Sequence, residues 1–128
     1  MIAVDTSALM AIALKEPATE GCIAALEAAD EIVISAGTLS EVLIVSTQQA
    51  SLRLALTDLI DSFGFNVVPV TEDSASRIGV TYDRWGKGVN PAGLNFGDCF
   101  AYEVARRFGC PLLYVGNDFA RTDIESVL

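Results

Sequence analysis

The sequence of 128 residues contains no histidine, and this absence excludes several kinds of chemistry. Ser-His-Asp and Cys-His catalysis, histidine-ligated zinc and imidazole general bases all need a side chain that this protein does not have. Cysteine is also scarce: Cys22, Cys99 and Cys110 lack Cys-x-x-Cys spacing, so neither a disulfide framework nor a zinc knuckle is predicted. We expect all three thiols to be small buried groups. Any catalysis therefore falls to carboxylates, hydroxyls or basic side chains, most simply with a hard cation.

Long apolar runs are absent as well. The run at residues 8–14 has only seven apolar residues, Asp5 precedes it, and no basic segment stands before it. Such a run is too short for a membrane span and lacks the features of a signal sequence, so we expect a cytoplasmic protein. With 52% apolar and 20% charged residues, a chain of this length is expected to fold as one globular domain over residues 1–128.

Positive charge is in short supply: eight Lys and Arg stand against 17 Asp and Glu, which gives a net charge of −9. The molecule as a whole would repel a polyanion. Six of the eight basic residues nevertheless fall in the last 52 positions, namely Arg77, Arg84, Lys87, Arg106, Arg107 and Arg121. A local basic surface is therefore compatible with the sequence.

Apolar periodicity divides the chain into alternating strands and helices. Short apolar runs predict buried strands at residues 2–5, 31–35, 66–70 and 112–115, and an edge strand at 124–128. Helical patterns are predicted at residues 8–14, 17–28, 37–45, 51–64, 71–85 and 95–109. The glycine-rich stretch 86–93 is the one long loop, and it is placed as a substrate flap would be. The alternation predicts an α/β fold with a mainly parallel sheet.

The same periodicity predicts which helix positions are buried. In the third helix these are Leu39, Val42, Leu43 and Val45, and in the fifth Ala75, Ile78, Tyr82 and Trp85.

Four acids are predicted where strands end or helices begin. Asp5 ends the first strand, Glu41 lies one turn into the third helix, Asp98 lies in the first turn of the last helix, and Asp118 follows the fourth strand. In a parallel sheet with helical crossovers these ends meet at one edge, where open α/β folds bind ligands. We therefore expect the four carboxylates to be neighbours.

Each acid also has a purely structural explanation. Asp5 could simply cap the first helix. The segment Thr38-Leu39-Ser40-Glu41 matches a capping box, which is the better explanation of Glu41 taken alone. Asp98 could only complement the helix dipole, and Asp118 could form an Asx turn with Asn117. The predicted convergence favours a site, because capping does not require four separate segments to meet.

Four ionised carboxylates close together would repel one another, and their pKa values would rise unless a positive charge lay between them. A divalent metal ion supplies such a charge. Oxygen ligands without nitrogen or sulfur suit Mg²⁺ or Mn²⁺.

Taken together, these segments resemble the PIN-domain ribonucleases, in particular the VapC-type toxins of bacterial toxin-antitoxin pairs. The resemblance covers the whole chain and rests on Asp5-Thr6-Ser7-Ala8, on Glu41, on residues 94–102 and on residues 116–123. It implies a PIN-like three-layer α/β/α sandwich with a short, mainly parallel sheet. It also implies an Mg²⁺ or Mn²⁺ site built by Asp5, Glu41, Asp98 and Asp118, with the hydroxyl of Thr6 or Ser7 nearby.

One position departs from the family pattern. Many such proteins carry a second acid where this chain has Asn117, so Asp118 is the fourth acid of the implied site. Asp123, further along the same segment, is interpreted as a loop residue in preference to an outer-shell acid.

By this resemblance the chain is expected to be a metal-dependent endoribonuclease, the toxin of a toxin-antitoxin pair, that hydrolyses RNA phosphodiesters with a metal-activated water. Arg84, Lys87 and Arg121 flank the glycine-rich loop and the metal edge, and they are our candidates for contacts with RNA phosphates. Arg106 and Arg107 are expected to be solvated charges, since cations late in a helix are stabilising in any case. The family also implies a VapB-type antitoxin and a homodimer, whose seam we expect on the apolar faces of the early helices.

Two other functions stay open. A receiver-type signalling domain also gathers acids at strand ends around Mg²⁺, but it needs a lysine after a late strand, and this chain has none beyond Lys87. A catalytically inactive PIN domain used only for binding is less compatible with four intact acids.

Overall fold

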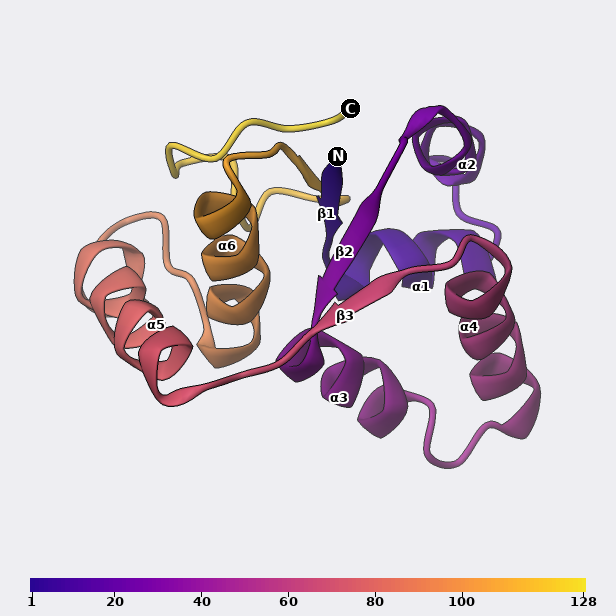
Figure 1. The fold of residues 1–128 in the computed structure, drawn as a ribbon, viewed down its shortest axis with the longest axis horizontal. Helices are drawn as coiled ribbons and strands as arrows, with labels where there is room; N and C mark the ends of the chain where they lie inside the picture. Colours follow the sequence, from indigo (N-terminus) through magenta and orange to yellow (C-terminus); the bar gives the residue numbers. More distant parts are fainter.

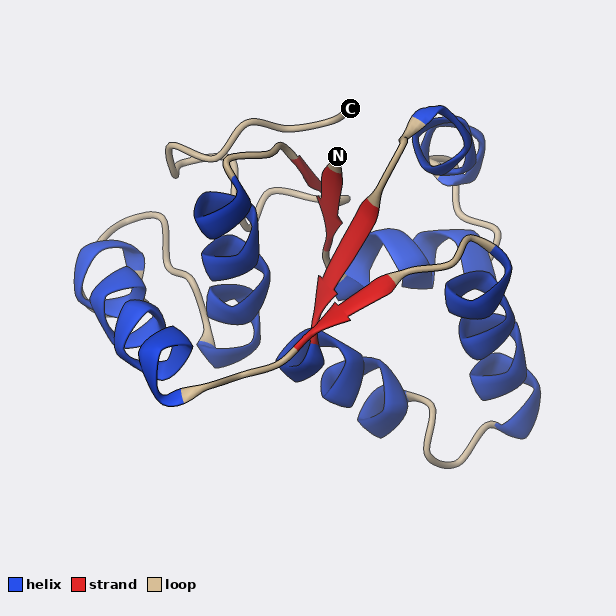
Figure 2. Ribbon diagram, in the orientation of Figure 1, coloured by secondary structure: helices blue, strands red, loops and turns tan.

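The computed structural model describes all residues from 1 to 128 and shows an α/β fold of four strands and six helices (Figures 1 and 2). The strands are β1 Ile2–Val4, β2 Ile32–Ser35, β3 Asn66–Val68 and β4 Leu112–Leu113. The helices are α1 Thr6–Ala13, α2 Thr19–Ala28, α3 Ala36–Val45, α4 Ala50–Ser62, α5 Glu72–Trp85 and α6 Phe96–Phe108. None of the six combines the length and the apolar character that a membrane span requires.

The sheet has the strand order β3-β2-β1-β4, and all three strand pairs are parallel. Ala3 in β1 pairs with Val33 on one side and with Leu112 on the other, so these three residues form a row across the sheet. Parallel strands need crossover connections, which the helices provide. The predicted parallel sheet is confirmed.

Side chains on the two faces of the sheet enter separate apolar cores. The row of Ala3, Val33 and Leu112 packs with residues of α6, whereas Val4 and Ile34 pack on the opposite face with residues of α1, α2 and α4. Figure 1 shows α1, α2 and α4 on one side of the sheet and α5 and α6 on the other. The predicted three-layer α/β/α sandwich is therefore confirmed.

Two strands run directly into helices, with no loop between them. The Asp5 side chain caps α1, so the helix begins at Thr6 and not at the predicted Ala8. Likewise, the hydroxyl of Ser35 at the end of β2 accepts a hydrogen bond from the Gly37 N–H at 3.1 Å and caps α3. The first turns of α1 and α3 are thereby held at the edge where β1 and β2 end.

Two further helix starts differ from the prediction. α2 begins at Thr19 and not at Pro17, because a turn closed by the Thr19 N–H and the Glu16 carbonyl, 3.0 Å apart, comes first. α4 begins at Ala50, which places Ser51 inside the helix and not at its cap.

The sheet is smaller than predicted. β3 ends at Val68, two residues early, and β4 has only two residues. Residues 124–128 form no strand; they make one isolated parallel bridge, between Ser126 and Leu112. These short strands still suffice to hold both cores.

Some burial predictions are wrong. Leu43 and Val45 are exposed by 37% and 44%, because the last turn of α3 leads away from the sheet (Figure 1). Tyr82 in α5 is exposed by 38%, since α5 packs on α6 and not on the sheet. The three cysteines are buried and free, as predicted.

The edge formed by the C-terminal ends of β1, β2 and β4, together with the first turns of α1, α3 and α6, is called the carboxylate edge below. It carries Asp5, Glu41, Asp98 and Asp118.

Candidate metal centre

Asp5 is fixed at the end of β1 by two hydrogen bonds from Ser7. Its Oδ2 accepts hydrogen bonds from the Ser7 backbone N–H at 3.0 Å and from the Ser7 hydroxyl at 2.7 Å. The same hydroxyl accepts a hydrogen bond from the Val115 N–H at 3.0 Å, so Ser7 joins the ends of β1 and β4. Asp5 is only 4% exposed, and burial raises the pKa of its carboxyl despite these hydrogen bonds, with Glu41 adding repulsion.

Glu41 does not cap α3, and the capping-box explanation is wrong for this residue. The cap is Ser35, and Glu41 instead accepts a hydrogen bond from the Thr6 hydroxyl, with 2.5 Å between Oγ1 and Oε1. Its Oε2 lies against the backbone of Gly97: a Cβ atom added at Gly97 would be 2.3 Å from this oxygen. Glu41 therefore reaches between α1 and α6.

Gly97 had no role in the sequence prediction. Glycine inside a helix is unfavourable by about 1 kcal/mol relative to alanine. A glycine next to Asp98 in the first turn of the helix was therefore the available signal that another group approaches the backbone closely there.

Asp98 combines a cap with a site position. Its Oδ2 accepts from the Asn95 N–H at 3.0 Å, and the Asn95 side chain accepts from the Asp98 N–H at 2.8 Å, which completes a capping box for α6. Burial raises the pKa of the Asp98 carboxyl to about 6, although the backbone hydrogen bond opposes the shift, and repulsion from Asp5, Asp118 and Glu41 adds to it. The charges of the other three acids are thus felt at Asp98.

Asp118 lies in the turn after β4 and is exposed. Its neighbour Phe119 is only 1% exposed and packs against Tyr114, with ring centroids 5.1 Å apart, which anchors the turn. The alternative explanation of Asp118, an Asx turn, does not apply, since the Ala120 N–H donates to the Asn117 carbonyl. Asp118 is therefore free to face the edge.

The four acids carry no counter-charge, and none of them takes part in a salt bridge. Asp5, Glu41 and Asp98 each fix one oxygen by hydrogen bonds and leave the other without a partner. Thr38 Oγ1 is the only buried side-chain polar atom without a partner, so the free carboxylate oxygens are in contact with solvent. Unpaired, accessible oxygens of this kind fit Mg²⁺ or Mn²⁺. No three acids are close enough together to hold an ion as they stand.

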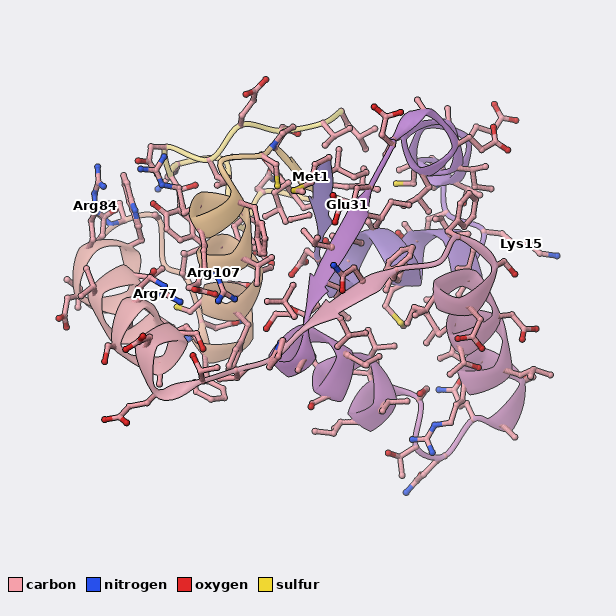
Figure 3. The ribbon with its side chains drawn as sticks, in the orientation of Figure 1. Met1, Lys15, Glu31, Arg77, Arg84 and Arg107 are labelled. Carbon is pink, nitrogen blue, oxygen red and sulfur yellow. The ribbon has the colours of Figure 1, made fainter.

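The predicted RNA-binding residues form no salt bridge with these acids. Arg84 lies 3.5 Å from Asp123 and over the ring of Trp85, and the Arg121 guanidinium donates to the Pro91 carbonyl at 3.4 Å. Lys87 makes no ion pair. Figure 3 shows Arg84 at the outer end of α5.

Asp123 is held away from the carboxylate edge. Its Oδ1 accepts the hydroxyl of Tyr102 at 2.6 Å, and this hydrogen bond, with Arg106 and Arg84 nearby, lowers the pKa of the carboxyl despite partial burial. These contacts support its interpretation as a loop residue. Arg106 lies 3.9 Å from Asp123 but is exposed, as predicted, whereas Arg107 is held by the buried Glu103 at 3.3 Å.

The fold and the acidic edge define an α/β protein of the PIN type, and the PIN domain family model matches residues 2–125. Ribonuclease VapC28 of Mycobacterium tuberculosis is 41% identical over 128 residues, covering 98% of this chain and 96% of that protein. Ribonuclease VapC of Mycolicibacterium smegmatis is 36% identical, covering 97% and 98%. The chain therefore belongs to the VapC ribonuclease family of PIN-domain proteins, which removes the receiver-type alternative.

Solved structures agree in fold. VapC20 of Mycobacterium tuberculosis, described as a sarcin-ricin loop cleaving toxin, superposes with a TM-score of 0.77 at 18% identity, covering 97% of this chain and 96% of that one. A toxin-antitoxin complex from Klebsiella pneumoniae gives a TM-score of 0.71 at 21% identity, covering 96% and 93%.

Proposed function

We propose that this protein is a metal-dependent endoribonuclease, the toxin of a toxin-antitoxin pair, and that residues 1–128 act as one PIN domain. The observation that carries the proposal is the placement of Asp5, Glu41, Asp98 and Asp118, from four parts of the chain, at one edge of the sheet without a basic partner. The names of the VapC relatives support RNA as the substrate.

The roles of the four acids follow from their oxygens. Asp5, Glu41 and Asp98 would hold Mg²⁺ or Mn²⁺ through their free oxygens, with Asp118 binding directly or through water. Thr6 orients Glu41, and Ser7 orients Asp5. The bound ion would lower the pKa of a water molecule and stabilise negative charge on the phosphate.

The partners implied by the family are a VapB-type antitoxin and a second copy of the chain. The antitoxin proposal is supported by the structural neighbour that is itself a toxin-antitoxin complex. For the homodimer, exposed apolar side chains favour the end of α3 among the early helices, together with the start of the last helix, α6: Ile44 is 70% exposed and Phe96 is 73% exposed.

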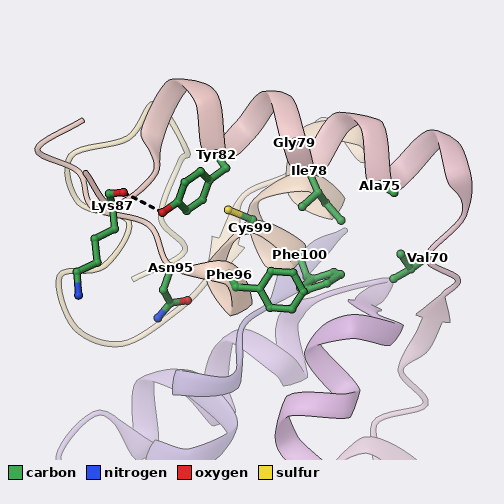
Figure 4. Close-up of a pocket in the computed structure, with 10 residues that line it drawn as sticks. All are labelled: Val70, Ala75, Ile78, Gly79, Tyr82, Lys87, Asn95, Phe96, Cys99 and Phe100. Carbon is green, nitrogen blue, oxygen red and sulfur yellow. Dashed lines mark hydrogen bonds between the residues drawn. The ribbon is translucent and has the colours of Figure 1, made fainter. Parts of the chain in front are cut away.

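Phe96 stands between two apolar hollows of about 680 and 740 Å³, which share Val70, Phe96 and Phe100. Figure 4 shows the first hollow, with Phe96 and Phe100 on one side and Tyr82 of α5 on the other. In a two-fold symmetric contact the same surface of both copies must fit itself, and here the exposed Phe96 ring of one copy would enter the hollow of the other. We therefore place the homodimer seam here.

The test of the nuclease proposal compares wild-type protein with Asp98→Asn. Structured RNA is incubated with each protein in Mg²⁺, in Mn²⁺ or in EDTA, and cleavage is followed on gels. Wild-type cleavage should require metal, and Asp98→Asn should lower the rate by roughly a hundredfold or more, since even outer-shell changes at metal sites cost 10- to 100-fold. Asp61→Asn, an exposed acid on α4 without an ion pair, is the matched control and should cleave normally.

Metal-dependent cleavage that persists in pure Asp98→Asn protein would refute the site. The melting temperature gives a second readout, since an ion that binds only the folded state must raise it. A wild-type protein that is stabilised by Mn²⁺ but does not cleave RNA would instead be an inactive binding module.

A further inference from the structure

A second charged site lies between α5 and α6, outside the carboxylate edge. It is a groove of about 330 Å³, here called the arginine groove, and its charged lining residues are Arg77, Arg84, Glu103, Arg106 and Arg107. Four of the eight basic residues of the chain line this one groove. Figure 3 shows Arg77 on α5 and Arg107 on α6 facing the space between the two helices.

A buried carboxylate holds two of these arginines. Glu103 is only 3% exposed, and its Oε1 lies 2.8 Å from Nε of Arg77 and 3.3 Å from Nε of Arg107. Both contacts use Nε, so the terminal Nη groups of the two guanidiniums take no part in them. The side chains of Arg77 and Arg107 are 43% and 27% exposed, which leaves these donors open to the groove.

A second carboxylate holds the other two. Asp123 Oδ2 lies 3.5 Å from Arg84 and 3.9 Å from Arg106, distances too long for hydrogen bonds. Oδ1 of Asp123 is fixed by the Tyr102 hydroxyl, which itself accepts from the Trp85 indole N–H at 3.0 Å. Arg84 and Arg106 are thus loosely paired and more than half exposed.

The charge of the groove is opposite to that of the molecule. Four guanidiniums share two carboxylates, which leaves a net charge of +2 on a protein whose total is −9. Guanidinium forks bind phosphate oxygens in pairs, and arginines held in place beforehand lose little side-chain freedom on binding. The ligand that suits this arrangement is a phosphodiester chain.

The groove is connected to the carboxylate edge by two segments. α6 carries Asp98 in its first turn and Arg106 eight residues later, about 12 Å further along the helix axis. The C-terminal loop carries Asp118 at one end and Asp123 at the other. An RNA strand cut at the carboxylate edge could therefore continue along this loop to the arginines.

We propose that the arginine groove binds the phosphate backbone of the RNA substrate beside the cleavage site. The proposal rests on the proposed nuclease function. It replaces the assignment of Arg106 as a solvated charge, and it gives Arg84 a defined place in RNA binding.

The test measures binding without metal, so that it does not depend on cleavage. Fluorescein-labelled single-stranded RNA is titrated with Asp98→Asn protein in EDTA at several salt concentrations, and anisotropy is read. Adding Arg84→Gln and Arg106→Gln should weaken binding roughly tenfold at low salt and reduce the slope of log affinity against log salt by about 1.4, or 0.7 for each lost contact. Both residues are exposed, so melting temperatures should be unchanged.

Two further variants separate a local site from general charge. Lys15→Gln removes one positive charge from the turn after α1, where Lys15 has no ion pair, and should leave affinity and slope unchanged. Asp123→Asn keeps an acceptor for Tyr102 but raises the groove charge to +3, and it should tighten binding. Weaker binding by Asp123→Asn would contradict the electrostatic argument.

Equal affinity and equal salt slope in the double variant and its parent would overturn the proposal, even if Asp98 proves essential for cleavage. If the parent protein bound polyglutamate but not RNA, and the double variant lost this binding, the assignment of the groove to RNA would be overturned. Conversely, if the groove variants lose RNA binding but the wild-type protein never cleaves RNA, the nuclease proposal fails and the assignment of the groove as an RNA-binding site is upheld.

Discussion

Replacing Asp98 by asparagine should stabilise the metal-free protein at pH 8, although it removes a proposed metal ligand. The reason is that Asp98 is ionised at this pH in a place where burial and three other carboxylates disfavour its charge. Asparagine keeps a side-chain oxygen that can accept the Asn95 N–H, so the capping box survives.

The magnitude follows from the pKa of Asp98, which rises from an ordinary value of 3.8 to about 6 in the folded protein. This difference corresponds to about 3 kcal/mol of stability lost above pH 6. Solvent and salt reduce part of this destabilisation, and loss of a negative charge at the helix N-terminus costs about 0.3–1 kcal/mol. A net gain of about 1–2 kcal/mol is therefore expected, or about 3–10 °C in melting temperature.

The sign of the pH dependence is fixed by the same numbers. Well below pH 3.8, Asp98 is protonated in both the folded and the unfolded wild-type protein, so the wild type and Asp98→Asn should be about equally stable. Between pH 4 and pH 6 only the unfolded state releases the proton, and the wild type loses stability relative to the variant. The difference in unfolding free energy between Asp98→Asn and the wild type should grow across this interval and stay constant above it.

The assay is urea unfolding of both proteins in EDTA between pH 4 and pH 8, repeated with Mg²⁺. Metal should stabilise the wild type more than the variant and so reduce the difference in their unfolding free energies at pH 8. A variant that is less stable than the wild type at pH 8 without metal, or a difference independent of pH, would refute the reasoning.

Two remaining predictions concern the neighbours of the site. Gly97→Ala should displace the Glu41 carboxylate and lower metal-dependent cleavage, because the new Cβ would lie 2.3 Å from Oε2. The control Gly79→Ala, with no atom within 4 Å of the new Cβ, should stabilise helix α5 by about 0.5–1 kcal/mol and leave cleavage unchanged. Urea unfolding measures the stability and RNA gels the cleavage of both variants, and a fully active Gly97→Ala protein would contradict the argument. Light scattering should find the wild-type protein to be a homodimer, as proposed, and Phe96→Ser to be a monomer; a Phe96→Ser protein that stays dimeric would place the seam elsewhere.

The sequence was informative where structure depends on near neighbours along the chain. The Asn95 cap, the acid three residues later and the strand ends carrying Asp5 and Asp118 could all be read from patterns a few residues long. Glu41 shows the limit: its capping box was a good local match, yet Ser35 caps the helix and Glu41 bonds to Thr6.

The sequence by itself determined the α/β alternation, the exclusion of imidazole chemistry and the four acids at strand and helix ends. It did so because periodicity, capping and composition are local properties. Only the tertiary structure decided which groups meet: Thr6 with Glu41 across 35 positions, Arg77 with Glu103 across 26, and Gly97 against a carboxylate. These contacts join residues that are far apart in the sequence and depend on how the helices pack around the sheet, which a pattern a few residues long does not encode.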